Sequence, residues 1–258
     1  MKRVLVLGGT REAQQISAGL QALGMTVTLA LKGLTRAPKV PEGVTLRSGG
    51  FGGSAGLAAY LADSQTELLI DATHPFATGM SWNAYGAAQL SGVPLYQILR
   101  PGWARQPGDR WRTLGSLAKA AMLLRSAPPQ RVMLALGGQG AEQFRACPQH
   151  RFQARVLRTS RTALATSAAH RWRGLEVVPM DQAPGLGDEL AGMRRFAPDL
   201  MIVRNAGGAM SAKLAAARRL HLPIWMIARP QMPAVPRFAS PAALLAYLVA
   251  GDGGTDAP

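Results

Sequence analysis

Two glycines and a threonine follow the first apolar segment of the chain, in the stretch VLVLGGTREA. The dinucleotide-binding pattern G-x-G-x-x-G falls here on Gly8, Thr10 and Ala13, so its middle glycine is missing. Backbone N–H groups at the start of a helix bind phosphate, and Thr10 can cap that helix while its hydroxyl adds a donor. The stretch therefore predicts a nucleotide or phosphate turn, and an ordinary tight strand-to-helix turn is the alternative.

Cations stand where an NAD site of this type has an acidic residue, about 20 residues beyond the glycines. The segment LALKGLTRAPK contains Lys32, Arg36 and Lys39 and no Asp or Glu. Positive side chains at this position match a 2′-phosphate, so NADPH is favoured over NADH if a dinucleotide binds. An exposed basic loop without a ligand is the alternative.

Two further stretches of the first half carry polar or flexible residues behind predicted strands. SGGFGG, residues 48–53, allows close backbone approach to a flat or phosphorylated ligand. DATHPFA, residues 71–77, follows the fourth strand, and Pro75 disfavours helix at His74. His74 is a candidate ligand contact, proton donor or carboxylate partner, although a lone histidine is more often structural.

The second half repeats the order strand, glycines, helix at residues 136–144 and 203–220. Both stretches are candidate anion sites, because backbone donors gather at a helix start. The later one combines such donors with a hydroxyl and an ammonium group, from Asn205, Gly207, Gly208, Ser211 and Lys213. A well-capped helix without a ligand is the alternative.

The elements that must position these residues are short apolar runs that alternate with helix-like segments. Strands that read as continuous apolar runs are covered on both faces, so the rhythm predicts an α/β fold with parallel sheets. The Pro-, Gly- and Arg-rich segment RPGWARQPGDRW reads as a linker. We therefore expect one α/β domain over residues 1–104, a second over 105–250, and a disordered tail over 251–258.

Charge is the most informative bulk property. The 258 residues carry 29 Lys and Arg, 24 of them Arg, against 14 Asp and Glu, for a net charge of +15. Because the guanidinium pairs with carboxylate and phosphate, the excess favours an anionic small molecule, although codon usage explains part of it. The scattered arginines and 6% aromatic residues argue against nucleic acid.

Other bulk features narrow the class of protein. The single cysteine, Cys147, permits no internal disulfide framework and offers no metal cluster. The chain contains no long apolar run and no signal-peptide pattern, so we expect a cytoplasmic protein without a membrane partner.

The ordered motifs GGTREA, GGFGG, DATHPFA, RPGW and NAGG with AKLAAARRLHLPIWMIARP resemble the precorrin-6A reductase family of cobalamin (vitamin B12) biosynthesis over residues 3–230. The resemblance implies two Rossmann/flavodoxin-like domains that flank a cleft, in an oxidoreductase that uses NADPH to reduce the precorrin-6A macrocycle to precorrin-6B. The expected partner is a carboxylate-rich tetrapyrrole. One departure is Ala206, where the family often has serine, which puts a hydrogen bond at that position in doubt.

With this resemblance, the expected site residues fall into three groups. His74 is the expected proton donor. The expected NADPH-binding residues are Gly9, Thr10, Arg11, Lys32, Arg36, Gly50 and Gly52. The expected substrate-binding residues are Thr73, Phe76, Asn205, Gly207, Gly208 and Lys213.

Three alternatives stay open at this point: a cobalt-precorrin-6A reductase of the anaerobic pathway, a non-catalytic NADPH-binding protein, and a nucleic-acid-binding protein. The oligomeric state is also open.

Overall fold

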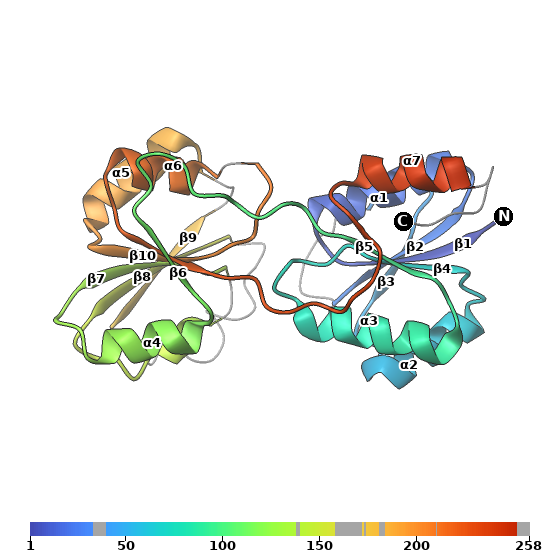
Figure 1. Ribbon diagram of the computed structural model, residues 1–258, viewed down its shortest axis with the longest axis horizontal. Coiled ribbons are helices and arrows are strands. Elements are labelled where there is room, and N and C mark those ends of the chain that lie inside the picture. The colour runs from blue at the N-terminus through green and yellow to red at the C-terminus, as the bar shows by residue number, and fades with distance from the viewer. Residues whose placement is uncertain are drawn as a thin grey trace. The chain divides into compact units, whose positions relative to one another are not determined.

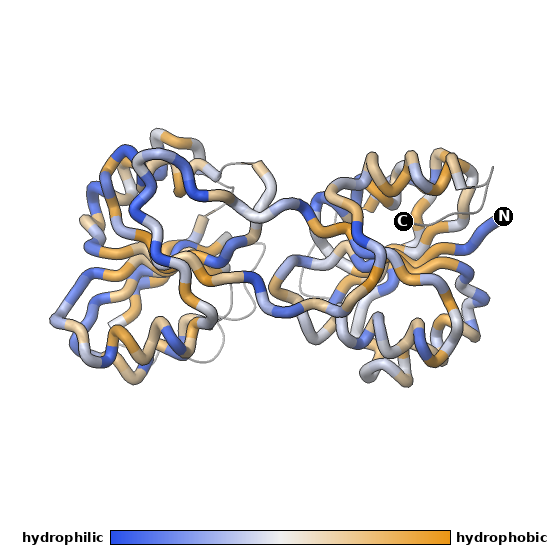
Figure 2. Tube along the Cα trace, viewed as in Figure 1, coloured by the Kyte–Doolittle hydropathy of each residue, from blue (hydrophilic) through white to orange (hydrophobic). Residues whose placement is uncertain are grey.

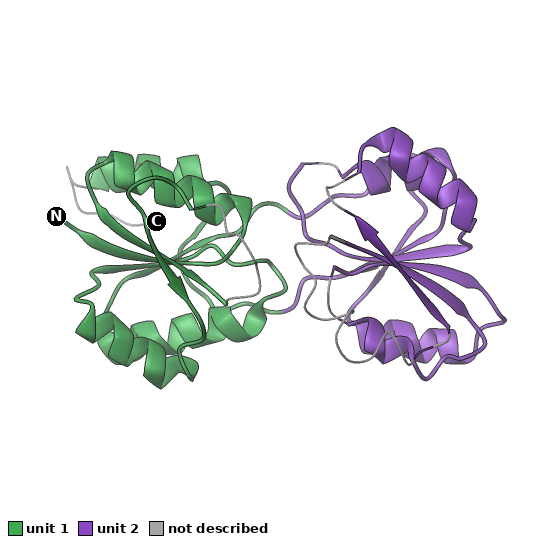
Figure 3. Ribbon diagram, turned by 180° about the vertical axis from the view of Figure 1, so that it is seen from behind, with its two compact units in different colours: residues 1–101, 231–258 green, residues 102–230 purple. Residues whose placement is uncertain are grey.

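The computed structural model describes residues 1–32, 40–137, 140–157, 172, 174–180, 184–209 and 211–251. The chain forms two compact units (Figure 3). Unit 1 contains Met1–Pro101 and Gln231–Pro258, and unit 2 contains Gly102–Pro230.

Unit 1 is built on a parallel six-stranded sheet with the strand order β12-β5-β4-β1-β2-β3. Helices α1 and α7 cover one face and α2 and α3 the other (Figure 1). The elements are β1 Arg3–Leu7, α1 Arg11–Ala22, β2 Thr26–Leu31, β3 Thr45–Ser48, α2 Gly53–Asp63, β4 Leu68–Asp71, α3 Thr78–Ser91, β5 Leu95–Ile98, β12 Arg237–Phe238 and α7 Pro241–Gly251.

Unit 2 has an equivalent parallel sheet, in the order β6-β11-β10-β7-β8-β9. Helices α5 and α6 cover one face and α4 the other (Figure 1). The elements are β6 Trp111–Leu114, α4 Leu117–Arg125, β7 Arg131–Ala135, the 3₁₀ helix η1 Ala141–Phe144, β8 Arg151–Leu157, β9 Leu175–Met180, α5 Leu186–Phe196, β10 Leu200–Arg204, α6 Ala212–Arg219 and β11 Ile224–Ile227.

Burial explains why the central strands form where apolar runs were recognised. Every residue of β4 is buried, as are four of the five in β1 and in β10. The tube in Figure 2 accordingly turns orange along the strands at the centre of each unit. Both units are therefore α/β and Rossmann-like, as expected from the continuous apolar segments.

The two edge strands β6 and β12 were not predicted, and their positions correct the domain boundaries. The chain leaves unit 1 after β5, builds all of unit 2, and returns to add β12 and α7. The predicted assignment of residues 231–250 to the second domain is wrong, because Arg237 and Phe238 pair with Gln97 and Ile98 of β5. Residues 252–258 of the predicted tail lie outside the described residues.

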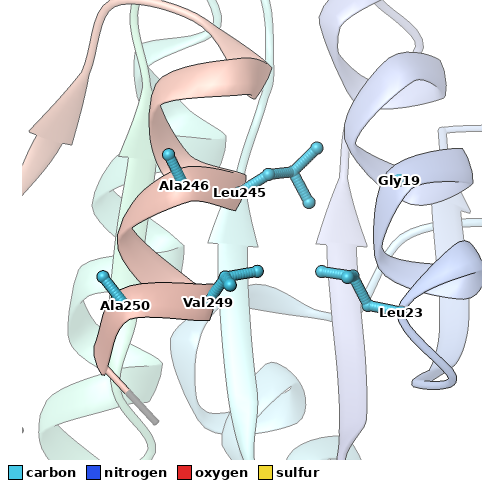
Figure 4. Close-up of a pocket in the computed structure, with 6 residues that line it drawn as sticks. All are labelled: Gly19, Leu23, Leu245, Ala246, Val249 and Ala250. Atoms are coloured by element: carbon cyan, nitrogen blue, oxygen red, sulfur yellow. The ribbon is translucent and has the colours of Figure 1, made fainter. Parts of the chain in front are cut away.

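Close packing of α7 on α1 fixes this return in unit 1. A Cβ at Gly19 would lie only 2.4 Å from Leu245 Cδ1, so glycine lets the Leu245 side chain lie against α1 without being displaced. Leu245 points toward α1 in Figure 4, and an apolar surface groove of about 460 Å³ runs between the helices past Leu23 and Val249. This groove contains no group able to do chemistry.

The segment predicted as a linker is ordered on unit 2. The Asp109 carboxylate, whose side chain is fully buried, pairs with Arg218 of α6 at 2.8 Å and accepts the Gln106 N–H. Strand β6 begins at Trp111, two residues later. Among the residues that the structure describes, no helix is long and apolar enough to cross a membrane.

Candidate functional site

The strand order of unit 1 places its candidate site at the carboxyl ends of β1 and β4. From β1 the chain moves to β2 on one side, whereas from β4 it moves to β5 on the other. The turns after these neighbouring strands therefore diverge at a topological switch point, the position at which parallel α/β sheets most often bind ligands. Gly8–Thr10 follow β1 and Ala72–His74 follow β4.

Gly8 is required by packing between these two turns. Its φ is +123°, and a Cβ would lie 2.7 Å from the carbonyl oxygen of Ala72. Glycine at this position thus lets the turn after β1 pass directly over the end of β4.

Thr10 is the N-cap of α1, as predicted. Its Oγ1 accepts a hydrogen bond from Ala13 N (3.0 Å) and donates one to Ala72 O (2.7 Å). The hydroxyl hydrogen is thereby directed at Ala72, which corrects the expectation of an extra donor for an anion. The donors left at this turn are the backbone N–H groups that open α1, because the first turn of a helix has no internal partners for them. Gly9 and Arg11 are exposed beside it.

Glu12, in the first turn of α1, is neutralised by Arg100 at 2.8 Å. Burial alone would raise the pKa of the Glu12 carboxyl, but hydrogen bonds from Arg100 and the backbone, and the Arg100 charge, lower it below its ordinary value. The carboxylate beside the candidate anion site is therefore paired.

The ends of β2 and β3 bring further predicted residues to the same edge. Lys32 directly follows β2 and is exposed, whereas Arg36 lies outside the described residues. Gly49 N donates to Leu31 O at 2.9 Å, which joins the glycine loop after β3 to the end of β2.

Arg47 organises that glycine loop, a role that sequence reasoning missed. Its guanidinium donates to Gly49 O and Gly50 O, and lies 3.8 Å from the ring centroid of Phe51 and 4.8 Å from that of Tyr60. A Cβ at Gly50 or Gly52 would meet no atom within 4 Å. Gly52 has a φ of +79° and needs glycine for its backbone, but Gly50 does not have a left-handed φ. Nothing in the part of the chain that the structure describes therefore explains glycine at position 50.

Asp71 shapes the segment after β4. Its Oδ1 accepts both Thr73 N (3.0 Å) and Thr73 Oγ1 (2.6 Å), and its Oδ2 accepts Gln97 Nε2 (2.8 Å). Gln97 Oε1 in turn accepts Arg237 Nε from β12 at 3.0 Å. The predicted substrate contact Thr73 thus has its hydroxyl held by Asp71, and the returning strand β12 supports this arrangement.

His74 is exposed, and its Nδ1 accepts the Phe76 N–H at 3.2 Å. This bond assigns the neutral ring the tautomer with hydrogen on Nε2. The His74 and Phe76 rings lie 6.0 Å apart. Two residues predicted for the site are therefore neighbours, and the bond to Nδ1 fixes the orientation of the His74 ring.

In unit 2, Asn205 holds the segment that enters from unit 1. Its Oδ1 accepts Trp103 N at 2.7 Å and its Nδ2 donates to Trp103 O at 3.1 Å. Both ends of the predicted substrate-binding amide are therefore engaged with backbone. Gly207 and Gly208 follow with φ of +70° and +85°, so their backbone turn itself requires glycine.

Lys213 lies in the first turn of α6 and lines a pocket of about 340 Å³ in unit 2, together with Arg155 and Glu189. Burial lowers the pKa of the Lys213 ammonium, an effect that Glu189 opposes and Arg155 reinforces. Burial also raises the pKa of the Glu189 carboxyl, and the charge of Asp188 adds to this, against the attraction of both cations. Lys213 is therefore not grouped with the Asn205 amide at Trp103 but with a buried ion pair.

Known proteins resemble this chain along almost its whole length. Residues 3–249 match the family described as Precorrin-6x reductase CbiJ/CobK. A precorrin-6A reductase from Rhodobacter capsulatus is 41% identical over 236 residues, covering 91% of this chain and 90% of that protein. The solved structure of CobK precorrin-6A reductase matches over 100% of both chains, with 35% identity and a TM-score of 0.86. The chain belongs to this family.

A more distant relative bears a related name. A cobalt-precorrin-6A reductase from Methanothermobacter thermautotrophicus is 26% identical over 241 residues, covering 89% of this chain and 77% of that protein. As a precorrin-6x reductase, the chain is an oxidoreductase. The reductase family and the Rossmann-like strand order of both units support a nicotinamide cofactor.

Several polar groups of this precorrin-6x reductase were not predicted. Gln97 and Arg237 are separated by 140 residues, and Arg155 and Glu189 lie on a strand and a helix without any shared motif. Only Arg47 had a local signal, since it immediately precedes the SGGFGG loop.

Proposed function

We propose that this chain is a precorrin-6A reductase that uses NADPH to reduce the macrocycle to precorrin-6B. The observation that supports the proposal is similarity over nine-tenths of both chains to a protein named precorrin-6A reductase. The expected cobalamin pathway and the tetrapyrrole partner follow from the same similarity.

The carboxyl edge of unit 1 fits the cofactor. We assign its phosphates to backbone donors at Gly9, Thr10 and Arg11. The exposed Lys32, with Arg36, is assigned to the 2′-phosphate. Gly50 and Gly52 supply open backbone, because no atom of the described residues fills the space that a Cβ would take at either position. When bound, NADPH supplies a hydride.

The residues of the chain then orient reactants and handle a proton. Asp71 fixes Thr73, and the hydrogen bond from Phe76 N–H to Nδ1 orients the His74 ring. We assign His74 as the proton donor, which passes a proton to substrate from its imidazolium form and is left as the neutral ring, and Thr73 and Phe76 as substrate contacts. Asn205, Gly207, Gly208 and Lys213 remain proposed substrate contacts in unit 2. Orientation is expected to supply most of the rate, since the site residues need form no covalent bond to substrate.

The reaction is tested by anaerobic incubation of the full chain with NADPH and either metal-free precorrin-6A or its cobalt complex. We expect NADPH oxidation with the metal-free macrocycle, measured by absorbance. We also expect a product heavier than precorrin-6A by two hydrogens, measured by mass spectrometry. NADPH oxidation with the cobalt complex but not with the metal-free macrocycle would identify a cobalt-precorrin-6A reductase instead. Tight NADPH binding without oxidation by either macrocycle would contradict a reductase.

The cofactor assignment is tested with Lys32→Ala. Loss of a charged contact to the 2′-phosphate should weaken NADPH binding about tenfold and leave NADH binding unchanged. Calorimetric titration of both cofactors measures this. Lys119→Ala, at an exposed lysine of α4, is the matched control. Equal losses for NADPH and NADH would contradict the assignment.

A further inference from the structure

The pocket in unit 2 is a built polar site on the α5 and α6 side of its sheet. It lies beside the carboxyl-terminal part of β7, and Arg155 enters from β8, Glu189 from α5 and Lys213 from α6. Methionines from three strands, Met133, Met180 and Met201, supply apolar wall. Charged groups from separate elements therefore converge in one largely apolar enclosure.

The charged side chains among the described residues that line this pocket do not balance. Arg155 Nη1 and Glu189 Oε2 form an ion pair at 2.5 Å, with side chains only 15% and 6% exposed. Lys213 lines the same pocket and adds a second cation. Among the described residues that line the pocket, two cations therefore accompany one carboxylate, and an unbalanced buried charge is costly unless an anion joins it.

Space for the Arg155 guanidinium is provided by the neighbouring helix. A Cβ at Gly192 of α5 would lie only 3.1 Å from Arg155 Nη1, so the absence of a side chain at Gly192 leaves room for the guanidinium. The cation is therefore held by packing as well as by Glu189.

Ser211, the N-cap residue of α6, supplies an independent sign of a ligand. It lines the pocket, and its Oγ is buried without a hydrogen-bond partner among the described residues. An N-cap hydroxyl usually accepts from the helix, but Ser211 makes no such side-chain bond. A buried hydroxyl without a partner costs about 1–3 kcal/mol, which a bound acceptor would relieve.

The charge of the lining side chains and the apolar wall of the pocket favour a carboxylate ligand over a phosphate monoester. An excess of one cation matches a carboxylate, which carries one negative charge, better than a phosphate monoester, which carries nearly two. The methionine-rich wall suits an aliphatic arm. The volume of about 340 Å³ lies at the small end of ligand pockets, enough for a side arm.

We propose that this pocket binds a carboxylate on a short aliphatic arm, which Ser211 Oγ and Lys213 Nζ hold by donated hydrogen bonds while Arg155 contributes charge. Resting on the proposed function, the arm belongs to the tetrapyrrole substrate. The pocket then selects the substrate by one of its carboxylate side chains.

The binding test uses propionate as the probe and ¹³C-methyl-methionine NMR of the full chain. Signals of Met133, Met180 and Met201 should shift saturably, while that of Met25 in unit 1 should not. Lys213→Met should weaken propionate about tenfold or more, Ser211→Ala several-fold, and the control Lys119→Met not at all. Unchanged spectra outside the pocket establish that the variants are folded.

Three results would overturn the pocket assignment: the absence of saturable shifts, equal shifts with neutral propionamide, or tighter binding of inorganic phosphate than of propionate. Steady-state kinetics separates this proposal from the proposed function. Lys213→Met should raise the KM for precorrin-6A about tenfold and leave the KM for NADPH unchanged. If Lys213→Met turns over with an unchanged KM for precorrin-6A, the pocket proposal alone is contradicted. If the unaltered chain binds propionate but shows no turnover, the proposed reductase function alone is contradicted.

Discussion

The two units share a strand order but end their equivalent central strands differently. In unit 1 the turn after β1 opens a 12-residue helix, α1, capped by Thr10. In unit 2 the turn after β7 opens only the four-residue η1. The prediction of a comparable helix after residue 140 is wrong, since the chain turns away before Pro148, which cannot donate within a helix.

Charged side chains occupy backbone groups of the turn after β7, at the switch point of unit 2. Gly140 N donates to Glu142 Oε2 at 2.9 Å, and Arg204 Nη1 donates to Leu136 O at 2.9 Å. A Cβ at Gly140 would lie 2.8 Å from Arg204 Nη2. Strand order therefore determines where a site can form, while side chains decide whether backbone donors stay available for an anion.

The strongest test of this contrast compares one substitution in the two turns. Gly8→Ala combines a φ of +123° with a collision against the backbone of Ala72, so unit 1 should lose about 3 kcal/mol or more. Gly137→Ala, at a φ of +72° with no atom of the described residues within 4 Å, should cost unit 2 about 1 kcal/mol. Hydrogen exchange of β1 and β7 peptides measures the two units separately.

Similar losses in both units would show that the approach of the β1 turn to β4 is not tight. The difference between the two variants, more than either value, carries the test because the residue change is the same.

A smaller effect is expected from the polar chain behind DATHPFA. Gln97→Leu removes a donor from the buried Asp71 carboxylate and should cost about 2 kcal/mol. Gln153→Leu in unit 2 removes a bond of similar length to Glu176, which is exposed, and should cost less than about 1 kcal/mol. Urea unfolding measures both, and equal costs would show that burial of the Asp71 carboxylate does not strengthen its dependence on the Gln97 donor.

The smallest effect is a difference in pH dependence. Glu12 has a lowered pKa, so its contribution is present above its ordinary value and is lost as pH falls through the folded-state pKa. Glu189 has a raised pKa, so its contribution is present below the ordinary value and is lost as pH rises through the folded-state pKa.

Relative to Glu12→Gln, the unaltered chain should therefore lose free energy of unfolding as pH falls toward about 4. Relative to Glu189→Gln, the unaltered chain should lose free energy of unfolding as pH rises above the ordinary carboxyl value of 4.5. Urea titrations over this range measure both, and slopes of the same sign would contradict the opposite environments of the two carboxylates.

Much of the fold could be predicted because each buried strand is a continuous apolar run in the sequence. The apolar runs of β1, β4 and β10 predicted a parallel α/β fold. Strand β12 could not be found in this way, because it is two residues long and follows a proline-rich segment. Its pairing with β5 is a long-range event, so local composition assigned residues 231–250 to the wrong unit.

The candidate site was predictable where one turn contains all its groups. Thr10 as a helix cap and the run DATHPFA at a strand end follow from adjacent residues. The Arg155, Glu189 and Lys213 cluster comes from three elements, and Asn205 meets Trp103 across 102 positions. Such contacts depend on the packed fold, and spacing along the chain does not encode them.

The late return of β12 and α7 has a consequence for synthesis on the ribosome. Strands β1 to β5 emerge first, yet their sheet must wait for about 130 further residues before its last strand and a covering helix appear. At typical translation rates this delay is on the order of 10 s. During that interval the β5 edge and the apolar flank of α1 are open to other nascent chains. A message truncated before codon 237 would release the same incomplete sheet, now with no prospect of closure.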